Sequence, residues 1–151
     1  MNVPTFTLEE MRARLGKPLE PSPWIEVDQG RIDAFARATE DLQWIHLDEA
    51  RARSSAFGGT IAHGFLTVSL LPRMMELSVA VPGARMTVNY GLNKVRFTAP
   101  LPSGSRVRGR FTPLQIEPVE GGVQVVWGAV VEREGAEKPC LVAEWLTRHY
   151  L

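Results

Sequence analysis

A carboxylate and an imidazole lie five positions apart in the stretch EDLQWIH, at Asp41 and His46. Five residues turn a side chain by about 140° on an α-helix, and an odd separation on a strand places two side chains on opposite faces. The two groups can therefore meet only if the chain bends between them. Such a pair in an apolar pocket can hold one water and exchange protons near neutral pH. The structural alternative is that Asp41 caps backbone amides while His46 makes a hydrogen bond in the core.

Gly64, in the stretch IAHG at residues 61–64, is a second candidate. It falls near the start of an apolar helical pattern, where amide N–H groups have no intrahelical partners and the helix dipole is positive. Glycine also lets a ligand approach the backbone closely. These features suit a developing oxyanion, such as the enolate oxygen of a thioester. The alternative is that Gly64 only permits a tight turn into the helix.

The elements that must position these residues are mainly helical in the first half of the chain. The spacing of Phe65, Val68, Leu71 and Met75 predicts a buried helix over residues 61–81, with a kink or an early end at Pro72. Capping residues, prolines and glycines give the remaining pattern: a helix over 8–15, a stiff connector over 18–23, a helix from Asp28 to about Thr39, a short turn over 49–53 and a loop over 54–59.

The second half of the chain is typical of antiparallel strands. A change of phase around Gly91 indicates a bulge in the first of them. The expected strands span residues 86–100, 105–111, 123–131 and 140–150. One apolar helix followed by several strands predicts an α+β domain whose curved sheet wraps the helix, and a helix this apolar in a short chain also predicts a homodimer.

Length and composition favour one domain over residues 1–151, in a cytoplasmic protein. Lys+Arg and Asp+Glu are 17 each, so net charge favours neither nucleic acid nor a membrane surface. The single Cys140 cannot form an internal disulfide, which fits a reducing compartment. No apolar run reaches the ~20 residues of a membrane span. The first residues also lack the pattern of a secretory signal.

The stretch from Ala38 to Asp48, followed by FGGTIAHG at residues 57–64, resembles the hydratase motif of MaoC-like (R)-specific enoyl-CoA hydratases. The resemblance is strongest over residues 28–72. It implies a hotdog fold, in which an antiparallel sheet wraps a long central helix and two subunits join their sheets. It also implies syn addition of water to a trans-2-enoyl-CoA, giving an (R)-3-hydroxyacyl-CoA, with no cofactor. Matched residue by residue, Asp41 and His46 hold the water, and the amide of Gly64 is the oxyanion donor.

Three positions depart from the family motif. Gln43 stands where the motif has Asn, Trp44 where it has Pro, and Pro72 where some relatives carry a Ser that steadies the site. We expect Gln43 to lie on the substrate side, and we expect His63 to order the loop above Gly64 beside the substrate. The acid–base pair itself is intact, so the departures bear on loop geometry and acyl-chain preference.

Basic residues in the strands have two interpretations. Lys94 and Arg96 share one strand face, where they either contact the phosphates of coenzyme A or are simply solvated. The alternating arginines at 106, 108 and 110 are best explained by a wet outer sheet face. A metal site is not expected, because the chain has three histidines, one cysteine and no close ligand pair. Nothing marks Cys140 as a nucleophile.

The sequence therefore favours a homodimeric enoyl-CoA hydratase acting on medium or long chains. Three alternatives stay open. The first is a dehydratase of 3-hydroxyacyl chains on acyl carrier protein, which uses the same chemistry. The second is a thioesterase, which would need a carboxylate aimed at water against the carbonyl. The third is a non-catalytic subunit that binds acyl thioesters, against which the presence of both Asp41 and His46 argues.

Overall fold

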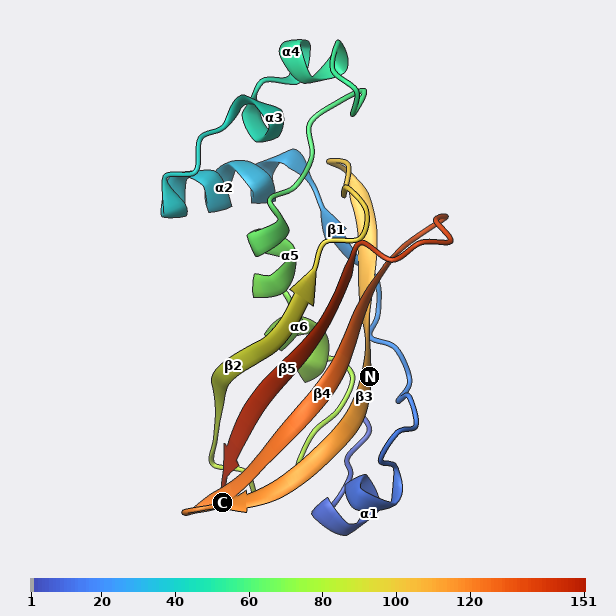
Figure 1. Ribbon diagram of the computed structural model, residues 1–151, viewed down its shortest axis with the longest axis vertical. Helices are drawn as coiled ribbons and strands as arrows, with labels where there is room; N and C mark the ends of the chain where they lie inside the picture. The colour runs from blue at the N-terminus through green and yellow to red at the C-terminus, as the bar shows by residue number, and fades with distance from the viewer. Residues whose placement is uncertain (1) are drawn as a thin grey trace.

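A five-stranded antiparallel sheet forms the body of the molecule in the computed structural model, which describes residues 2–151 (Figure 1). The strand order is β1-β3-β4-β5-β2. The sheet is strongly curved, and its concave face holds two consecutive short helices. The strands are β1 (Ile25–Val27), β2 (Met86–Arg96), β3 (Ser105–Val119), β4 (Gly122–Arg133) and β5 (Leu141–Tyr150). This is the α+β hotdog architecture that the sequence predicted.

The central helix is divided in two, as Pro72 predicted. Helix α5 spans Gly64–Ser69, and α6 spans Leu71–Glu76 with Pro72 in its first turn. Proline has no N–H for the bond to the fourth preceding carbonyl, so the ladder is interrupted at Leu70. The helical region is also shorter than the expected 61–81, because Ile61 pairs with Pro102 in an isolated bridge. Apolar side chains of the two helices, among them Leu66, Leu71 and Met74, share one core with sheet residues such as Phe111, Trp127 and Trp145.

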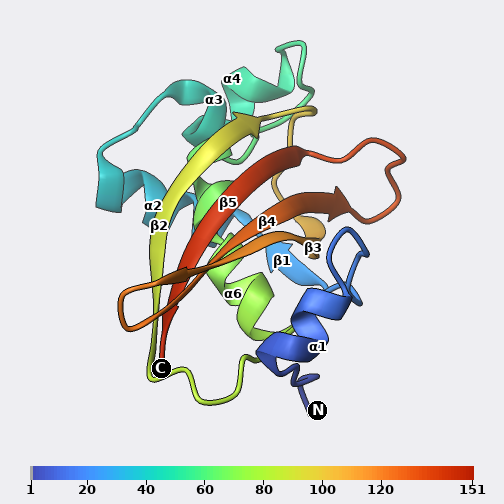
Figure 2. The same ribbon diagram turned by 60° about the horizontal axis from the view of Figure 1, so that its bottom comes forward.

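Further helices cover the two ends of this core (Figures 1 and 2). Helices α2 (Gln29–Thr39), α3 (Trp44–Leu47) and α4 (Glu49–Arg53) lie together beyond the start of α5. The side chains of Asp28 and Asp48 cap α2 and α4. Helix α1 (Leu8–Ala13) lies toward the opposite end and begins with a capping box at Thr7. No helix among residues 2–151 is long and apolar enough to cross a bilayer.

The strands expected over residues 86–100 and 105–111 were wrong in extent, and β1 was missed. Strand β3 continues past Phe111 to Val119, although prolines at 113 and 118 interrupt its sequence. These prolines are tolerated because β1 pairs only with Ser105–Val107, so the rest of that edge has no neighbouring strand. The connector along it donates single amides, such as that of Leu19 to the carbonyl of Phe111 at 2.8 Å. Strand β2 ends at Arg96 rather than at Pro100.

Two bulges interrupt the pairing of β2 with β5. Asn89 pairs with Thr147 but Gly91 with Leu146, so Tyr90 is an extra residue. Likewise Asn93 is extra between the pairs of Leu92 and Lys94. The first bulge adjoins Gly91, where the sequence predicted one. Strand β2 is the sheet's edge, and its large apolar side chains are exposed at Met86, Val88, Tyr90 and Leu92.

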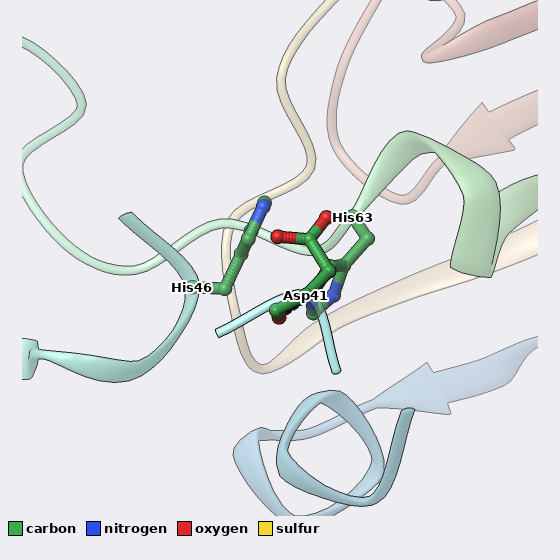
Figure 3. A group of neighbouring side chains, drawn as sticks. All are labelled: Asp41, His46 and His63. Carbon is green, nitrogen blue, oxygen red and sulfur yellow. Dashed lines mark hydrogen bonds between the residues drawn. The ribbon is translucent and has the colours of Figure 1, made fainter. Parts of the chain in front are cut away.

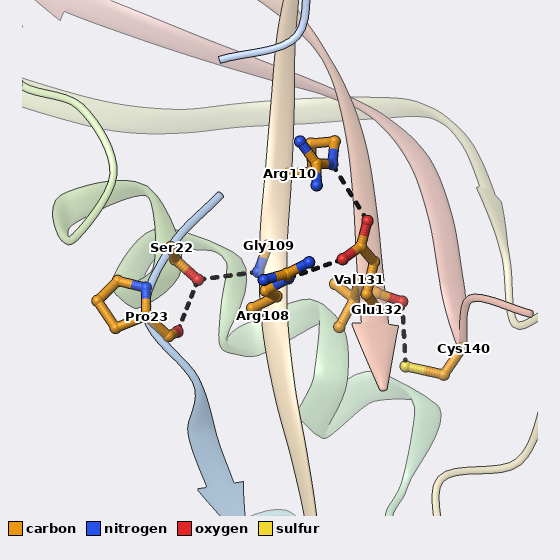
Figure 4. Close-up of polar contacts among 8 residues, drawn as sticks. All are labelled: Ser22, Pro23, Arg108, Gly109, Arg110, Val131, Glu132 and Cys140. Carbon is orange, nitrogen blue, oxygen red and sulfur yellow. Dashed lines mark hydrogen bonds and ion pairs between the residues drawn. The ribbon is translucent and has the colours of Figure 1, made fainter. Parts of the chain in front are cut away.

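The outer face of the sheet carries the arginines of β3. Arg108 and Arg110 both bond Glu132 on β4, at 2.7 and 3.1 Å (Figure 4). Arg106 bonds Glu134 at 3.1 Å. The expected wet outer face is confirmed. Figure 4 also shows the thiol of Cys140, which is buried and donates to the carbonyl of Val131 at 3.5 Å. Burial raises the pKa of Cys140 to about 11, so little thiolate forms at neutral pH.

Candidate active site

Asp41 and His46 meet, and His63 lies with them (Figure 3). A carboxylate oxygen of Asp41, a ring nitrogen of His46 and a ring nitrogen of His63 all lie within 4.8 Å of one another. Asp41 comes from the segment after α2, His46 from α3 and His63 from the residue that precedes α5. The structure shows no direct bond between the Asp41 carboxylate and the His46 ring, and a separation of this size accommodates one bridging water.

The bend that joins the pair begins at Glu40. This residue ends α2 in the left-handed region, with φ of 60°, which is uncommon for a residue other than glycine. The chain then runs irregularly through Asp41–Gln43 and enters α3 at Trp44. Because one helix stops and another starts within these few residues, the five-residue spacing brings the two side chains together.

The ring of His46 is held through its Nδ1. That atom lies 2.7 Å from the carbonyl oxygen of Ile61, which only accepts hydrogen bonds, so Nδ1 carries the proton. The amide of Ile61 in turn donates to the carbonyl of Ile45 at 3.0 Å. A neutral His46 therefore keeps the lone pair of its Nε2 for the pocket, which is the form that a proton acceptor needs.

Burial lowers the pKa of His46 below its usual value. The bond to Ile61 opposes this change, His63 adds to it, and the Asp41 carboxylate opposes it again. Desolvation disfavours a charged imidazole, and the net direction is downward. His46 is consequently neutral at physiological pH.

Gln29, which the sequence did not single out, holds this arrangement in place. The side-chain amide of Gln29, on α2, donates to the carbonyl of His46 at 2.7 Å. The oxygen of the same amide accepts from the hydroxyl of Thr60 at 2.6 Å. Gln29 therefore joins α2, α3 and the segment before α5. Its only sequence signal is its position after the Asp28 cap, and nothing in the sequence indicated its long-range partners.

A cavity of about 330 Å³ adjoins His46 and the start of α5. Its lining includes Gly64, Thr67 and Phe97. The ring of Phe97 lies against Gly64 so closely that a Cβ at position 64 would come within 2.9 Å of it. Phe97 is the second residue missed, because it lay within the expected strand over residues 86–100 and carried no motif of its own. A glycine at 64 is required for this close contact, whatever its amide does.

The remaining predicted site residues lie elsewhere. Gln43 is exposed at the start of α3 and makes no side-chain capping bond. The guanidinium carbon of Arg51 lies over the ring of Trp44, 4.1 Å from its centroid. Lys94 pairs across the sheet with Glu144 and Arg96 with Val142, on the face opposite to the core. Neither Lys94, Arg96 nor Gln43 lines the cavity beside His46.

The cluster of Asp41, His46 and His63 also has the composition of a metal site. The two imidazole rings, however, are stacked with centroids 3.7 Å apart and planes at 22°. A nitrogen lone pair lies in the plane of its ring, and nearly parallel planes do not converge on one ion about 2 Å from each nitrogen. The geometry suits proton transfer better than metal binding.

A curved antiparallel sheet around a divided central helix, with a carboxylate–imidazole pair at the helix start, defines the hotdog class of acid–base enzymes. The model of the MaoC-like domain matches residues 10–134. The chain thus belongs to the MaoC-like dehydratase family and is an enzyme of the lyase class, as the names of its dehydratase relatives indicate.

Similar proteins agree with this assignment. The chain is 44% identical to 3-hydroxyacyl-thioester dehydratase Z of Mycobacterium tuberculosis over 144 residues, which cover 95% of each protein. It is 45% identical to nodulation protein N of Rhizobium leguminosarum over 146 residues, covering 94% of this chain and 90% of that protein. Among solved structures, the (R)-hydratase of A. caviae superposes with a TM-score of 0.73 at 21% identity, covering 88% of this chain and 96% of the other.

Proposed function

We propose that the chain catalyses reversible syn hydration of trans-2-enoyl-CoA to (R)-3-hydroxyacyl-CoA. One observation carries the proposal: a carboxylate oxygen of Asp41 lies within 4.8 Å of a nitrogen of His46, and His46 lines the same cavity as Gly64. This spacing accommodates a single water held by both groups. The name of the mycobacterial relative, a 3-hydroxyacyl-thioester dehydratase, supports the same chemistry in the reverse direction.

Each group has a role in the hydration. Water adds its oxygen to C3 while its proton goes to the acceptor, for which the free Nε2 of neutral His46 is suited. The Asp41 carboxylate accepts the water's other hydrogen in a hydrogen bond and so orients the water, and the protonated His46 then delivers its proton to C2 on the same face, which returns His46 to its neutral form. The amide of Gly64 stabilises the enolate oxygen that develops at the thioester. The dehydration runs through the same steps in reverse.

The acyl chain has room along the central helices. Beyond the cavity at Gly64, a second cavity of about 350 Å³ lies between α5–α6 and β2, lined by Val68, Leu71 and Leu92. It shares Pro72, Asn89 and Trp145 with a third cavity of about 370 Å³ near the end of α6. A chain of medium or greater length would follow this course, and Pro72 would lie against it.

The carrier is coenzyme A in this proposal, with acyl carrier protein as the alternative. Lys94 and Arg96 face solvent on the outer side of β2, where they would meet the nucleotide phosphates or an acidic carrier. Gln43 would contact the thioester arm at the rim of the site. These three assignments are independent of the acid–base pair.

The chain would act as a homodimer joined through β2. The free edge of this strand offers unpaired backbone groups beside exposed Val88, Tyr90 and Leu92. Exposed apolar edges of this kind pair readily with another chain. A second copy would extend the sheet and cover the apolar side chains, and it would also close the groove beside α5 and α6.

The deciding experiment follows the ultraviolet absorbance of the conjugated enoyl thioester. The protein should remove this absorbance from enoyl-CoA of four to sixteen carbons, with chiral analysis giving the (R) alcohol. Unchanged absorbance at every chain length would refute the hydratase and favour a non-catalytic binding subunit. Release of free thiol would indicate a thioesterase instead, and faster turnover of the same chains on acyl carrier protein would change the carrier.

Two substitutions connect this activity to the pair. Asp41→Asn and His46→Gln should each lower turnover by about 10²–10⁴-fold, the range of general acid–base catalysis. Circular dichroism should show both variants folded, because the Asp41 side chain is exposed and Gln fits the place of His46. Near-normal rates in folded variants would place the chemistry elsewhere.

A further inference from the structure

We propose that His63 is a positioning residue, which fixes the backbone of Asp41 and the ring plane of His46 together without touching the substrate. This assignment deepens the proposed function and rests on it for the identity of the reaction. Its geometry, in contrast, is a property of the resting protein. Unlike the exposed Asp41, His63 is only 2% exposed, and it is absent from the lining of the cavity beside His46, so it lies away from both solvent and the cavity.

One hydrogen bond joins the His63 ring to the backbone of Asp41. The Nε2 of His63 lies 3.0 Å from the main-chain oxygen of Asp41. A carbonyl oxygen only accepts, so Nε2 carries the proton and donates. In the neutral ring Nδ1 is then a bare lone pair, and the tautomer of His63 is the opposite of that of His46.

The other ring nitrogen of His63 has no partner. Nδ1 is buried and lacks any hydrogen bond to the residues that the structure describes. A buried polar atom without a partner costs free energy, and each such case calls for an explanation. Turning the ring over would break the bond to Asp41. The orientation of His63 is therefore set by the bond to Asp41 and by the rings packed against it, and it leaves Nδ1 without a partner.

The face of the His63 ring supports His46. The two imidazoles are stacked at 3.7 Å between centroids, and Phe35 of α2 contacts His63 with centroids 4.9 Å apart. The hydrogen bond from Nδ1 to the carbonyl of Ile61 fixes one point of the His46 ring, so the motion that remains is a tilt of the ring plane. The flat ring of His63 at this distance limits the tilt, so Nε2 stays aimed at the pocket.

The segment that carries Asp41 depends on this contact. Leu42, the next residue, is 60% exposed, and the amide of Asp41 is 3.5 Å from the hydroxyl of Thr39, at the limit of a hydrogen bond. Within residues 2–151, no other side chain bonds the main chain of Asp41. The bond from His63 is therefore what ties Asp41 to the start of α5, next to Gly64.

Two variants separate the two contacts. His63→Phe keeps a flat ring for stacking and removes the donor to Asp41. His63→Gln keeps an N–H donor of similar reach and removes the ring. We expect kcat to fall in both, by about 10²-fold in His63→Phe, because a displacement of about 1 Å costs that much. KM should change little, since neither contact involves the substrate.

A matched control separates positioning from stability. Met11→Ala opens a cavity in α1, where Met11 is fully buried and away from the site. It should lower the melting temperature while leaving kcat unchanged. Should kcat stay normal in both His63 variants, or should KM rise while kcat holds, the positioning role is refuted.

Nitrogen-15 NMR of the three histidines tests the geometry without any assay. In the free protein His63 should show a protonated Nε2 and a bare Nδ1, and His46 the reverse. The reverse pattern at His63 would overturn the proposal even if both variants lose activity or fail to fold. A wild-type protein inactive on every enoyl thioester would refute the proposed function alone, because the NMR pattern would still decide the role of His63.

Discussion

The protonation state of His46 is set mainly by a backbone carbonyl and by burial, and no charged side chain among residues 2–151 makes a direct hydrogen bond to its ring. The carbonyl of Ile61 takes the proton on Nδ1, and the surrounding protein excludes the water that would stabilise a cation. Since desolvation is the largest influence, the pKa of His46 is lowered. The Nε2 of His46 is thus unprotonated in the free protein, which is the state that the proposed role as proton acceptor requires.

The pH dependence of activity follows from this state. If neutral His46 accepts the proton, hydration should persist as pH falls through about 6.5, the ordinary histidine pKa, and be lost only below it. The measurement is kcat/KM against pH for a short enoyl-CoA. An acid limb centred above pH 7 would contradict it. In His46→Gln this limb should disappear together with most of the rate.

Gly64 is expected to tolerate no side chain. In Gly64→Ala the new methyl group would meet the ring of Phe97, which is half exposed and can move away. The protein should fold with nearly unchanged melting temperature, while activity should fall by about 10²-fold as the cavity wall shifts. Gly59→Ala is the matched control, because nothing lies within 4 Å of its new methyl group. Equal activity of the two variants would rule out this role for Gly64.

At the scale of elements, a directed chain of hydrogen bonds joins β4, β5 and β2. The indole of Trp127 only donates, to the hydroxyl of Thr147 at 2.9 Å. That hydroxyl lies 2.8 Å from Nε2 of His149, and Nδ1 of His149 lies 3.1 Å from the hydroxyl of Thr87. Burial lowers the pKa of His149, so the ring is neutral. Thr147 can then donate to His149, which donates to Thr87.

Removing the buried hydroxyl of Thr147 from this series of hydrogen bonds should lower the free energy of unfolding. Thr147→Val keeps the shape and strand preference but leaves the fully buried indole N–H of Trp127 without an acceptor. The free energy of unfolding should fall by about 1–3 kcal/mol, measured by urea denaturation. Thr87→Val, at the exposed end of the chain, should lose clearly less. A larger loss for Thr87→Val would reverse the inferred order.

Local signals in the sequence indicated the elements well where they were strong. Asp28, Thr7 and Pro72 mark helix boundaries by their own side chains, and the spacing of Asp41 and His46 required the observed bend. Strand β1 was missed because three residues carry too short a pattern. The braces at Gln29 and Phe97 were missed because they act on residues distant in the sequence, and periodicity contains no information about such partners.

In the whole molecule, strand β2 presents a long sheet edge without a neighbouring strand, and its pairing with a second copy is testable. Sedimentation equilibrium at micromolar concentration should give twice the chain mass of 16.8 kDa. Val88→Lys should shift the population toward monomer, because it places a charge on the exposed edge strand. Leu15→Lys is a control of similar exposure beyond α1. A wild-type monomer at these concentrations would refute the dimer.

The two bulges of β2 have a consequence for the number of residues that this strand can contain. Each extra residue, Tyr90 and Asn93, turns the following side chains over, and together they restore the original alternation. Losing one of them would reverse either Thr87 and Asn89 or the segment that leads to Phe97. Insertions and deletions between Asn89 and Lys94 should therefore be tolerated in pairs, and functional relatives should differ there by even numbers of residues.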